Sequence, residues 1–241
     1  MVSNSISGFR SITYRSGYVY NWLTKRLYDQ KKKFLTISKI IGKNKTVLDL
    51  PCGTGFLCRF LDPSTEYIGY DLNHRFLKKL KLDFNRGKIK LKKLIIDLQN
   101  IFDYHLYPKK VDSIIFCDIL HHVFPKHVEL VENAKKHADK IIICEPVAVK
   151  PKDMQARDKF FRAVLYLARF FPEPLVKLTD FLFFDNDGIN SYENRSAWNH
   201  DELSLKSLYK DLGITESKIY KIDDDYIGVW ENNHHATPEK A

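Results

Sequence analysis

The chain has 241 residues, of which 44% are hydrophobic and 29% are charged, which allows one core of domain size inside a well-solvated surface. Lys and Arg number 39 against 30 Asp and Glu, so the formal net charge is +9. That balance fits nucleic acid, an anionic membrane or an acidic substrate as a partner, and it equally fits a merely lysine-rich composition. No run of 18 apolar residues occurs, so we expect no transmembrane segment.

The cysteines and the first residues indicate the compartment. The four cysteines form no CxxC pair, and no His/Cys group has the spacing of a zinc site, so we expect reduced thiols and no metal. Residues 1–11 lack the charged start and the apolar centre of a signal peptide. Both features favour a cytoplasmic localisation.

The first predicted element is an N-terminal helical segment at 12–42, in which a helix over 18–41 is ended by Gly42. Three consecutive lysines interrupt the apolar side of this helix, and we expect them to face water. After Gly42, strand and helix patterns alternate, which predicts a parallel sheet with covering helices. The lysines are Lys31, Lys32 and Lys33; the predicted strands are 46–50, 66–70, 90–96, 111–117 and 140–144, and the predicted helices are 56–61, 73–84 and 126–138.

The alternation stops after the fifth strand. Residues 147–199 are rich in aromatic side chains and are interrupted by prolines, which predicts an inserted helical lid over the binding pocket. An apolar acceptor site or a shallow contact with a membrane is the alternative for this segment. A helix at 201–212 and a β-hairpin at 217–230 follow, and residues 232–241 form a polar tail. The whole chain, 1–241, is predicted to be one domain.

The first strand runs into a glycine-containing turn. Asp49 and Leu50 end the strand, and the sequence continues Pro51-Cys52-Gly53-Thr54-Gly55. Glycines in such a turn let the main chain approach a ligand closely, and Asp71, at the end of the second strand, can bind a ribose diol. A doubly wound α/β domain holds an adenosine-type cofactor in this way.

The five βα units, the closing hairpin and this turn together resemble the class I S-adenosylmethionine-dependent methyltransferases, over residues 46–144 and the hairpin. The resemblance implies an α/β, Rossmann-like fold with a doubly wound seven-stranded sheet in the order 3-2-1-4-5-7-6, with strand seven antiparallel. It also implies S-adenosyl-L-methionine as the cofactor. The family pattern has glycine where this chain has Pro51, which removes one amide donor, but Gly53 and Gly55 are retained and we expect binding to survive.

By the same resemblance, acidic residues at the strand ends hold the cofactor. Asp49 lies near the methionyl amine, Asp71 binds the ribose hydroxyls and Asp97 accepts from the adenine amino group. For each of them the alternative is a purely local role, such as capping a turn or a helix. The predicted cofactor-binding residues are Asp49, Pro51, Cys52, Gly53, Gly55, Asp71, Leu72, Asp97, Leu98 and Asp118.

The residues after strands four and five are candidates for the acceptor side. His121 or His122 could take a proton from an acceptor hydroxyl or amine, and the alternative is that they only begin a helix or bind a buried carbonyl. Glu145 either reaches the acceptor or pairs with an arginine of the lid. Tyr192 and Arg195 are the further candidate substrate residues.

These patterns predict methyl transfer in line to a small-molecule acceptor, which could be apolar or lipid-like. The positive charge raises a nucleic-acid methyltransferase as an alternative, but strand four lacks the Asn/Asp-Pro-Pro-aromatic signature of enzymes that modify base amines. A non-catalytic protein that binds the cofactor or docks peripherally on a membrane is the third hypothesis.

Overall fold

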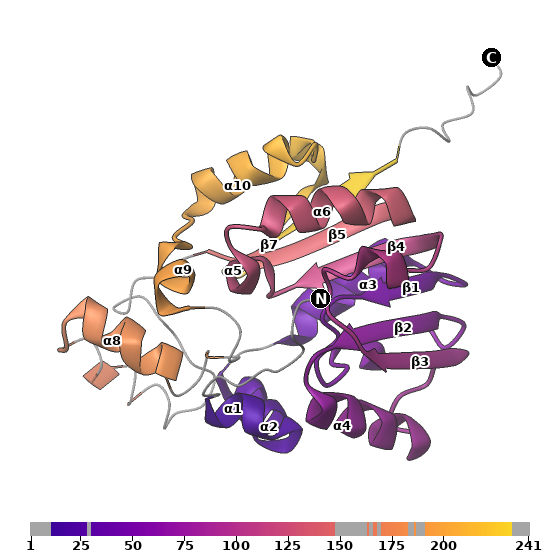
Figure 1. Ribbon diagram of the computed structural model, residues 1–241, viewed down its shortest axis with the longest axis horizontal. Coiled ribbons are helices and arrows are strands. Elements are labelled where there is room, and N and C mark those ends of the chain that lie inside the picture. Colours follow the sequence, from indigo (N-terminus) through magenta and orange to yellow (C-terminus); the bar gives the residue numbers. More distant parts are fainter. Residues whose placement is uncertain are drawn as a thin grey trace.

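The computed structural model describes residues 11–27, 30–147, 163, 166–167, 170–182, 186 and 191–232. Within these residues, seven strands form one sheet in the order β3-β2-β1-β4-β5-β7-β6 (Figure 1). Strand β7 is antiparallel to both of its neighbours, and the other pairings are parallel, which confirms the predicted fold class. The strands are β1 Thr46–Asp49, β2 Glu66–Asp71, β3 Lys93–Leu98, β4 Val111–Cys117, β5 Ala138–Pro146, β6 Ile219–Ile222 and β7 Asp225–Glu231.

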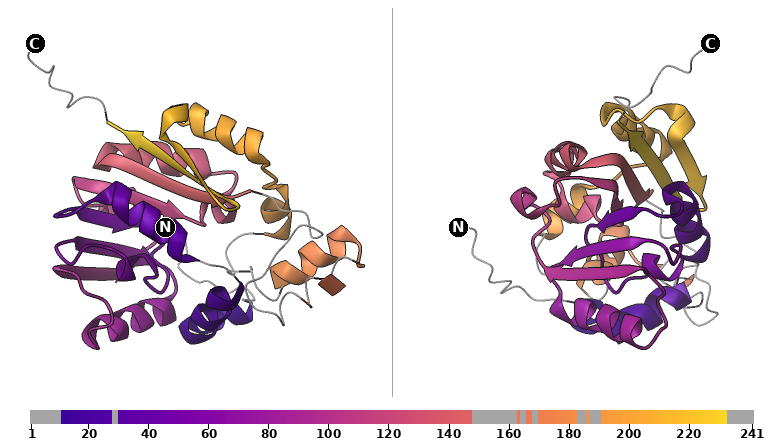
Figure 2. Two further views of the ribbon diagram at one scale, coloured as in Figure 1. Left: turned by 180° about the vertical axis from the view of Figure 1, so that it is seen from behind. Right: turned by 90° about the vertical axis from the view of Figure 1, so that its right-hand side faces the viewer.

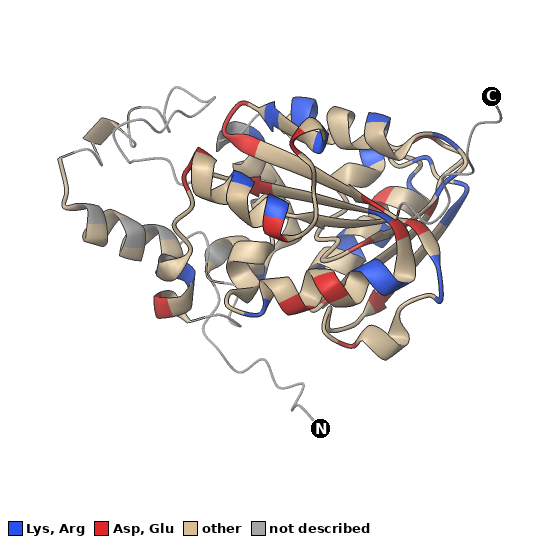
Figure 3. Cartoon of the chain, turned by 90° about the horizontal axis from the view of Figure 1, so that it is seen from above, with Lys and Arg blue, Asp and Glu red and all other residues tan. Residues whose placement is uncertain are grey.

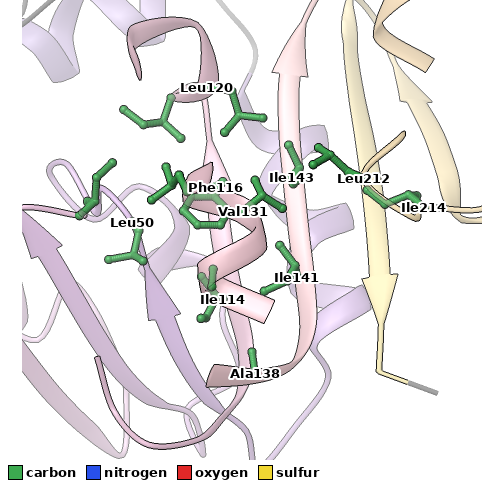
Figure 4. Close-up of a cluster of buried hydrophobic side chains, with 14 of the residues drawn as sticks. Leu50, Ile114, Phe116, Leu120, Val131, Ala138, Ile141, Ile143, Leu212 and Ile214 are labelled. Carbon is green, nitrogen blue, oxygen red and sulfur yellow. The ribbon is translucent and has the colours of Figure 1, made fainter. Parts of the chain in front are cut away.

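The central strands are buried on both faces, as their continuous apolar sequences require. Alternate residues of one strand belong to different core clusters: Ile114 and Phe116 lie on one face of β4, whereas Ile115 lies on the other. Figure 4 shows the first of these clusters, in which side chains of β4 and β5 contact those of the covering helices. The two clusters fix the sheet between two helical layers.

Each layer comes from separate parts of the chain. Helices α6 (His127–Ala134) and α10 (Glu202–Asp211) cover the face of Phe116, while α3 (Gln30–Ile41) and α4 (His74–Asn85) cover the opposite face. The layered arrangement is visible in the two views of Figure 2.

The carboxyl ends of the parallel strands meet at one end of the molecule. Here lie α1 (Ile12–Arg15), α2 (Gly17–Leu27), α5 (Leu120–Val123), α8 (Glu173–Asp180) and α9 (Tyr192–Ala197), as Figures 1 and 2 show. Because ligands of open α/β sheets bind outside these strand ends, this is the end that positions a site.

Some predicted boundaries are wrong. Strand β3, Lys93–Leu98, begins later than the predicted 90 and extends past the predicted 96, and Asp97 lies at its end as expected. The predicted helix over 18–41 corresponds to α2 and α3, and residues 28–29 lie outside the described residues. Residues 148–162 of the predicted lid and 233–241 of the predicted tail also lie outside them.

The prediction for the three lysines of the first helical segment is also wrong in one case. Lys31 and Lys32 face water, but Lys33 is buried because its ammonium group forms ion pairs with Asp118 and Asp225.

Basic and acidic stretches are interspersed along the described helices in the view of Figure 3. None of the helices in the described ranges combines the length and the apolar content that a membrane span requires.

Candidate active site

The turn after β1 contains two glycines with different environments. Both have positive φ, 52° at Gly53 and 71° at Gly55, a conformation that L side chains rarely adopt. A Cβ on Gly55 would overlap Leu80 of α4, whereas a Cβ on Gly53 would meet no atom within 4 Å. Gly55 therefore serves the packing of α4, and Gly53 leaves main chain open to a ligand.

Asp71, the last residue of β2, joins this turn to α4. Its Oδ2 accepts a hydrogen bond from the Gly53 amide (2.8 Å), and its Oδ1 accepts one from the Asn73 amide (2.7 Å). Asn73 in turn caps α4 by accepting from the Arg75 amide (3.1 Å). The carboxylate at the end of β2 is thus fixed beside the open glycine.

Asp49 lies beneath the turn. Its carboxylate accepts a hydrogen bond from the Tyr67 hydroxyl. Burial raises the pKa of Asp49 to about 7; the Tyr67 hydrogen bond opposes this shift, and the negative charge of Asp71 adds to it. Cys52 is buried against Gly69 of β2, where burial also raises the pKa of its thiol. Cys52 is therefore a packing residue of the turn and not a thiolate nucleophile.

The N-terminal helices contact the turn and the start of α4. The Thr54 hydroxyl donates to the Asn21 side chain (2.5 Å), and the Asn73 side-chain amide donates to the Tyr14 carbonyl (2.8 Å). Gly17 packs closely on the same turn, because a Cβ added to it would lie only 3.1 Å from the Thr54 side chain. Sequence reasoning missed Tyr14 and Asn21, because nothing local indicates that a segment before the sheet folds over the turn.

Asp97 and Leu98 end β3, the edge strand next to β2. In the strand register Asp97 is opposite Tyr70 and Leu98 is opposite Asp71. Both residues therefore lie at the same carboxyl end of the sheet as Asp71, the predicted ribose ligand. Leu98 is 58% exposed and Leu72 is half-buried. Burial raises the pKa of Tyr70, and the negative charge of Asp97 adds a smaller effect in the same direction.

Asp118 follows β4 with a positive φ of 55°. Its carboxylate accepts hydrogen bonds of 2.9 and 3.1 Å from the Lys33 ammonium group, which also lies 3.2 Å from Asp225. Burial alone would lower the pKa of Lys33, but attraction by Asp118 and its neighbours outweighs it and raises that pKa. The Asp118 carboxylate, one of the predicted cofactor-binding groups, is thus paired with a lysine from α3.

Glu145 lies behind His121 and is fully buried. One carboxylate oxygen accepts hydrogen bonds from the Ile119 and Leu120 amides, both at 2.7 Å, and the other lies 2.5 Å from His121 Nδ1. Burial raises the pKa of Glu145, against the lowering effect of the two amides and of the charges of His122 and Arg195. The arrangement orients the His121 ring, because a carboxylate at Nδ1 leaves Nε2 as the basic nitrogen.

His122 connects α5 with the N-terminal helices. Its Nε2 lies 3.4 Å from the Tyr14 hydroxyl, and its ring centroid is 4.4 Å from that of His121. Tyr192 and Arg195 lie half-buried on α9, which contacts α5. The predicted histidines and Glu145 therefore come together, with α9 beside them.

The comparisons with known proteins decide what this fold is. The model of a family described as a methyltransferase domain matches residues 41–202. The chain belongs to this methyltransferase family. Its strand order and the family together make it a class I S-adenosylmethionine-dependent methyltransferase domain, which confirms the resemblance seen in the sequence. No curated protein sequence matches this methyltransferase.

Solved structures similar to this methyltransferase share its fold at low identity. A SAM-dependent methyltransferase from Aquifex aeolicus has a TM-score of 0.51 at 16% identity, over 83% of this chain and 92% of that one. The carbon methyltransferase CurJ has a TM-score of 0.58 at 15% identity, over 90% of this chain and 58% of that one. A putative O-methyltransferase from Nostoc punctiforme has a TM-score of 0.57 at 14% identity, over 91% of this chain and 60% of that one. The methyltransferase thus spans about three fifths of the length of the latter two proteins.

Proposed function

We propose that this protein transfers the methyl group of S-adenosylmethionine to a small-molecule acceptor by in-line displacement. The observation that carries the proposal is the open main chain at Gly53, with the Asp71 carboxylate bonded to the same residue. A small open turn beside a fixed carboxylate fits a nucleoside with a ribose diol.

The residues around the turn fit the cofactor. When bound, S-adenosylmethionine supplies an electrophilic sulfonium methyl group. Asp71 would hold the ribose hydroxyls, Asp97 and Leu98 would lie at the adenine, and Asp49 and Asp118 would line the methionine side. The carboxyl group of Asp49, whose pKa is about 7, can meet a cationic amine as a carboxylate.

Next to this cradle, His121 would take the acceptor's proton at Nε2. Glu145 holds the opposite ring nitrogen, which stabilises a protonated imidazole in that orientation. His122, Tyr192 and Arg195 would line the acceptor. This arrangement suits a hydroxyl or amine acceptor that must lose a proton as the methyl group arrives, with the reacting atoms about 3–3.5 Å apart.

Calorimetry with S-adenosylmethionine tests the cofactor part. Asp71→Ala should weaken binding at least about tenfold, because charge-assisted hydrogen bonds contribute about 1.5–3 kcal/mol each. The thermal midpoint of the free variant is the control for folding, since the substitution also removes two bonds to amides. Unchanged affinity in a folded Asp71→Ala variant would contradict the ribose assignment.

A panel of small phenols, amines and thiols tests the acceptor part. With an acceptor that turns over, His121→Asn should lower kcat by about 100-fold and leave cofactor affinity unchanged. Glu145→Gln should shift the pH dependence of kcat. The side-chain oxygen of glutamine can still accept the hydrogen bonds from the Ile119 and Leu120 amides. If His121→Asn retains full activity, the proton-acceptor role is wrong, although methyl transfer itself can stand.

A further inference from the structure

Nearly all of the protein's net positive charge comes from one continuous segment. Residues 72–96 contain nine Lys or Arg against a single acidic residue, Asp83, which gives +8 of the chain's total of +9. The rest of the chain therefore carries a net charge of only +1. Every residue of the segment is described, and the segment comprises α4, the loop after it and the first part of β3.

Little of this charge is neutralised within the protein. The one acidic residue, Asp83, is buried and forms ion pairs with Lys79 and with Arg59 (2.9 Å). Lys92 pairs with Glu66 of β2 (2.8 Å). Six exposed cations of the segment form no ion pair with any residue that the structure describes. These six, called the basic edge below, are Lys78, Lys81, Arg86, Lys88, Lys90 and Lys93.

The basic edge borders a hollow between α4 and β3, which lie side by side in Figure 1. On α4, Lys78, Lys81 and Asn85 are three and four residues apart and therefore share one outward face. Lys81 and Asn85 also line the hollow, whose volume is about 340 Å³. The half-buried ring of Phe84 and residues 94–96 of β3 complete its lining.

The free side of β3 adds hydrogen-bonding groups beside this hollow. β3 is the outermost strand of the sheet and pairs with β2. Among the described residues, no strand pairs with its outer side, so main-chain donors and acceptors are available there. The side-chain amide of Asn85 lies at the same hollow. Cations, an aromatic ring and amide groups are thus gathered on one surface.

This combination favours single-stranded nucleic acid over other polyanions. Proteins hold single strands in basic grooves in which bases stack on aromatic side chains, and amide groups can bind base edges. A bilayer would require apolar side chains that insert, but no large apolar residue of the segment 72–96 is exposed. The carboxylates of an acidic polypeptide would pair with the cations but would leave the aromatic hollow empty.

We propose that the basic edge binds single-stranded nucleic acid, with phosphates along the six cations and one base stacked on Phe84 in the hollow. Lys93 begins β3, whereas Asp97 lies near its carboxyl end, so most of the basic edge is toward the other end of this strand from the candidate active site. The binding therefore does not depend on the proposed methyl transfer, and it does not make the nucleic acid the methyl acceptor.

Fluorescence anisotropy with a labelled oligoadenylate RNA tests this binding. The logarithm of the wild-type association constant should fall with the logarithm of salt concentration with a slope of about −3, as about four or five phosphate contacts to a single strand require. Lys81→Gln combined with Lys88→Gln should weaken binding at least about tenfold and make the slope shallower by about 1. Phe84→Leu should weaken binding about fivefold or more at an unchanged slope, because leucine fills the position without a ring for stacking.

Lys126→Gln combined with Lys136→Gln is the matched control. It removes the same charge from two exposed lysines that flank α6 on the other face of the sheet, and it should leave binding unchanged. The proposal is overturned if the wild-type protein does not bind the RNA, or if the control weakens binding as much as the Lys81 and Lys88 variant. It is also overturned if Phe84→Leu, shown to be folded by its thermal midpoint, keeps the wild-type affinity.

Competition experiments test the other polyanions. If polyglutamate or phosphatidylglycerol vesicles displace the labelled RNA as well as unlabelled RNA does at equal charge, the surface does not select nucleic acid and the proposal is wrong. Calorimetry with S-adenosylmethionine should give the same affinity for the wild type and the Lys81 and Lys88 variant. Lost RNA binding can therefore be distinguished from a failed cofactor assignment.

Discussion

At the scale of single residues, two carboxylates at the ends of neighbouring strands have different partners. The Asp71 carboxylate accepts hydrogen bonds from two backbone amides. The Asp49 carboxylate is buried beneath the turn, where it accepts a hydrogen bond from a hydroxyl group. Asp49 is consequently the group whose proton is held more tightly in the folded protein than in the unfolded chain, with a pKa of about 7 against an ordinary value of 3.8.

This difference predicts a pH dependence of stability. A carboxyl group with a raised folded-state pKa contributes stability that is fully present below about pH 4 and is lost as the pH rises through about 7. The asparagine in Asp49→Asn cannot titrate, and it retains an oxygen that accepts from Tyr67. As the pH rises from 4 to 8, the free energy of unfolding of the variant should therefore increase relative to that of the wild type by on the order of 3 kcal/mol. Urea unfolding of both proteins across this range measures the difference. A difference independent of pH would mean that Asp49 is ionised in the folded protein.

The two glycines of the turn predict different effects of the same substitution. Gly55→Ala should destabilise the fold by about 2–3 kcal/mol, because its Cβ overlaps Leu80 and its φ is positive. Gly53→Ala carries only the positive-φ cost of about 1 kcal/mol, but it should lower the affinity for S-adenosylmethionine by more than tenfold because the methyl group fills the open approach. Thermal unfolding and calorimetry of both variants make the comparison. Equal losses of stability, with cofactor affinity retained in Gly53→Ala, would remove the main argument for the cofactor cradle.

At the scale of elements, one buried lysine holds a helix to two strands. Lys33 of α3 reaches Asp118 after β4 and Asp225 at the start of β7, so a single cation neutralises carboxylates from both. Burial raises the pKa of Asp225 to about 6, and the nearby Lys33 opposes this shift. The structure therefore depends on the lysine being there.

Removal of this cation should be costly. Lys33→Met leaves the carboxylates of Asp118 and Asp225 without their shared cation, and it should destabilise the protein by about 2–3 kcal/mol. This is less than the roughly 3–5 kcal/mol expected when a fully buried ion pair is broken, because Asp118 is partly exposed. Lys32→Met is the control: its pair with Asp223 is exposed on both sides and should contribute less than about 1 kcal/mol. Denaturant unfolding at neutral pH gives both values. Similar values for the two variants would mean that water, rather than Lys33, compensates the carboxylates.

The elements also show where sequence reasoning succeeds. Buried strands and the glycine turn are readable because two-sided burial and positive φ restrict the residue types allowed at each position. Lys33 is missed because its neighbours Lys31 and Lys32 carry the same charge, and only the fold brings Asp118 and Asp225 to one of the three. The exact bounds of β3 are missed because edge strands tolerate polar residues, so hydropathy does not mark where pairing begins and ends.

At the scale of the whole molecule, the candidate site brings together segments that are far apart in the sequence. Tyr14 meets His122 across 108 residues of sequence through its hydroxyl, and its carbonyl accepts from Asn73. The N-terminal helices are thus hydrogen-bonded both to the glycine turn after β1 and to α5. If the N-terminal helices cover the site, their hydrogen bonds to the turn and to α5 must break and re-form whenever a ligand enters or leaves.

Asn73→Ser separates this closing contact from the cap of α4. A serine hydroxyl can still accept from the Arg75 amide, so α4 should keep its cap, but it is too short to donate to the Tyr14 carbonyl. Hydrogen exchange should become faster in residues 12–27 of the variant, with α10 as an unaffected reference. In the wild type, S-adenosylmethionine at about 100 times its Kd should slow exchange of the same residues by up to about 100-fold, because opening then competes with binding. If the cofactor protects only the turn at 51–55 and leaves α1 and α2 unchanged, the N-terminal helices do not close over the cofactor.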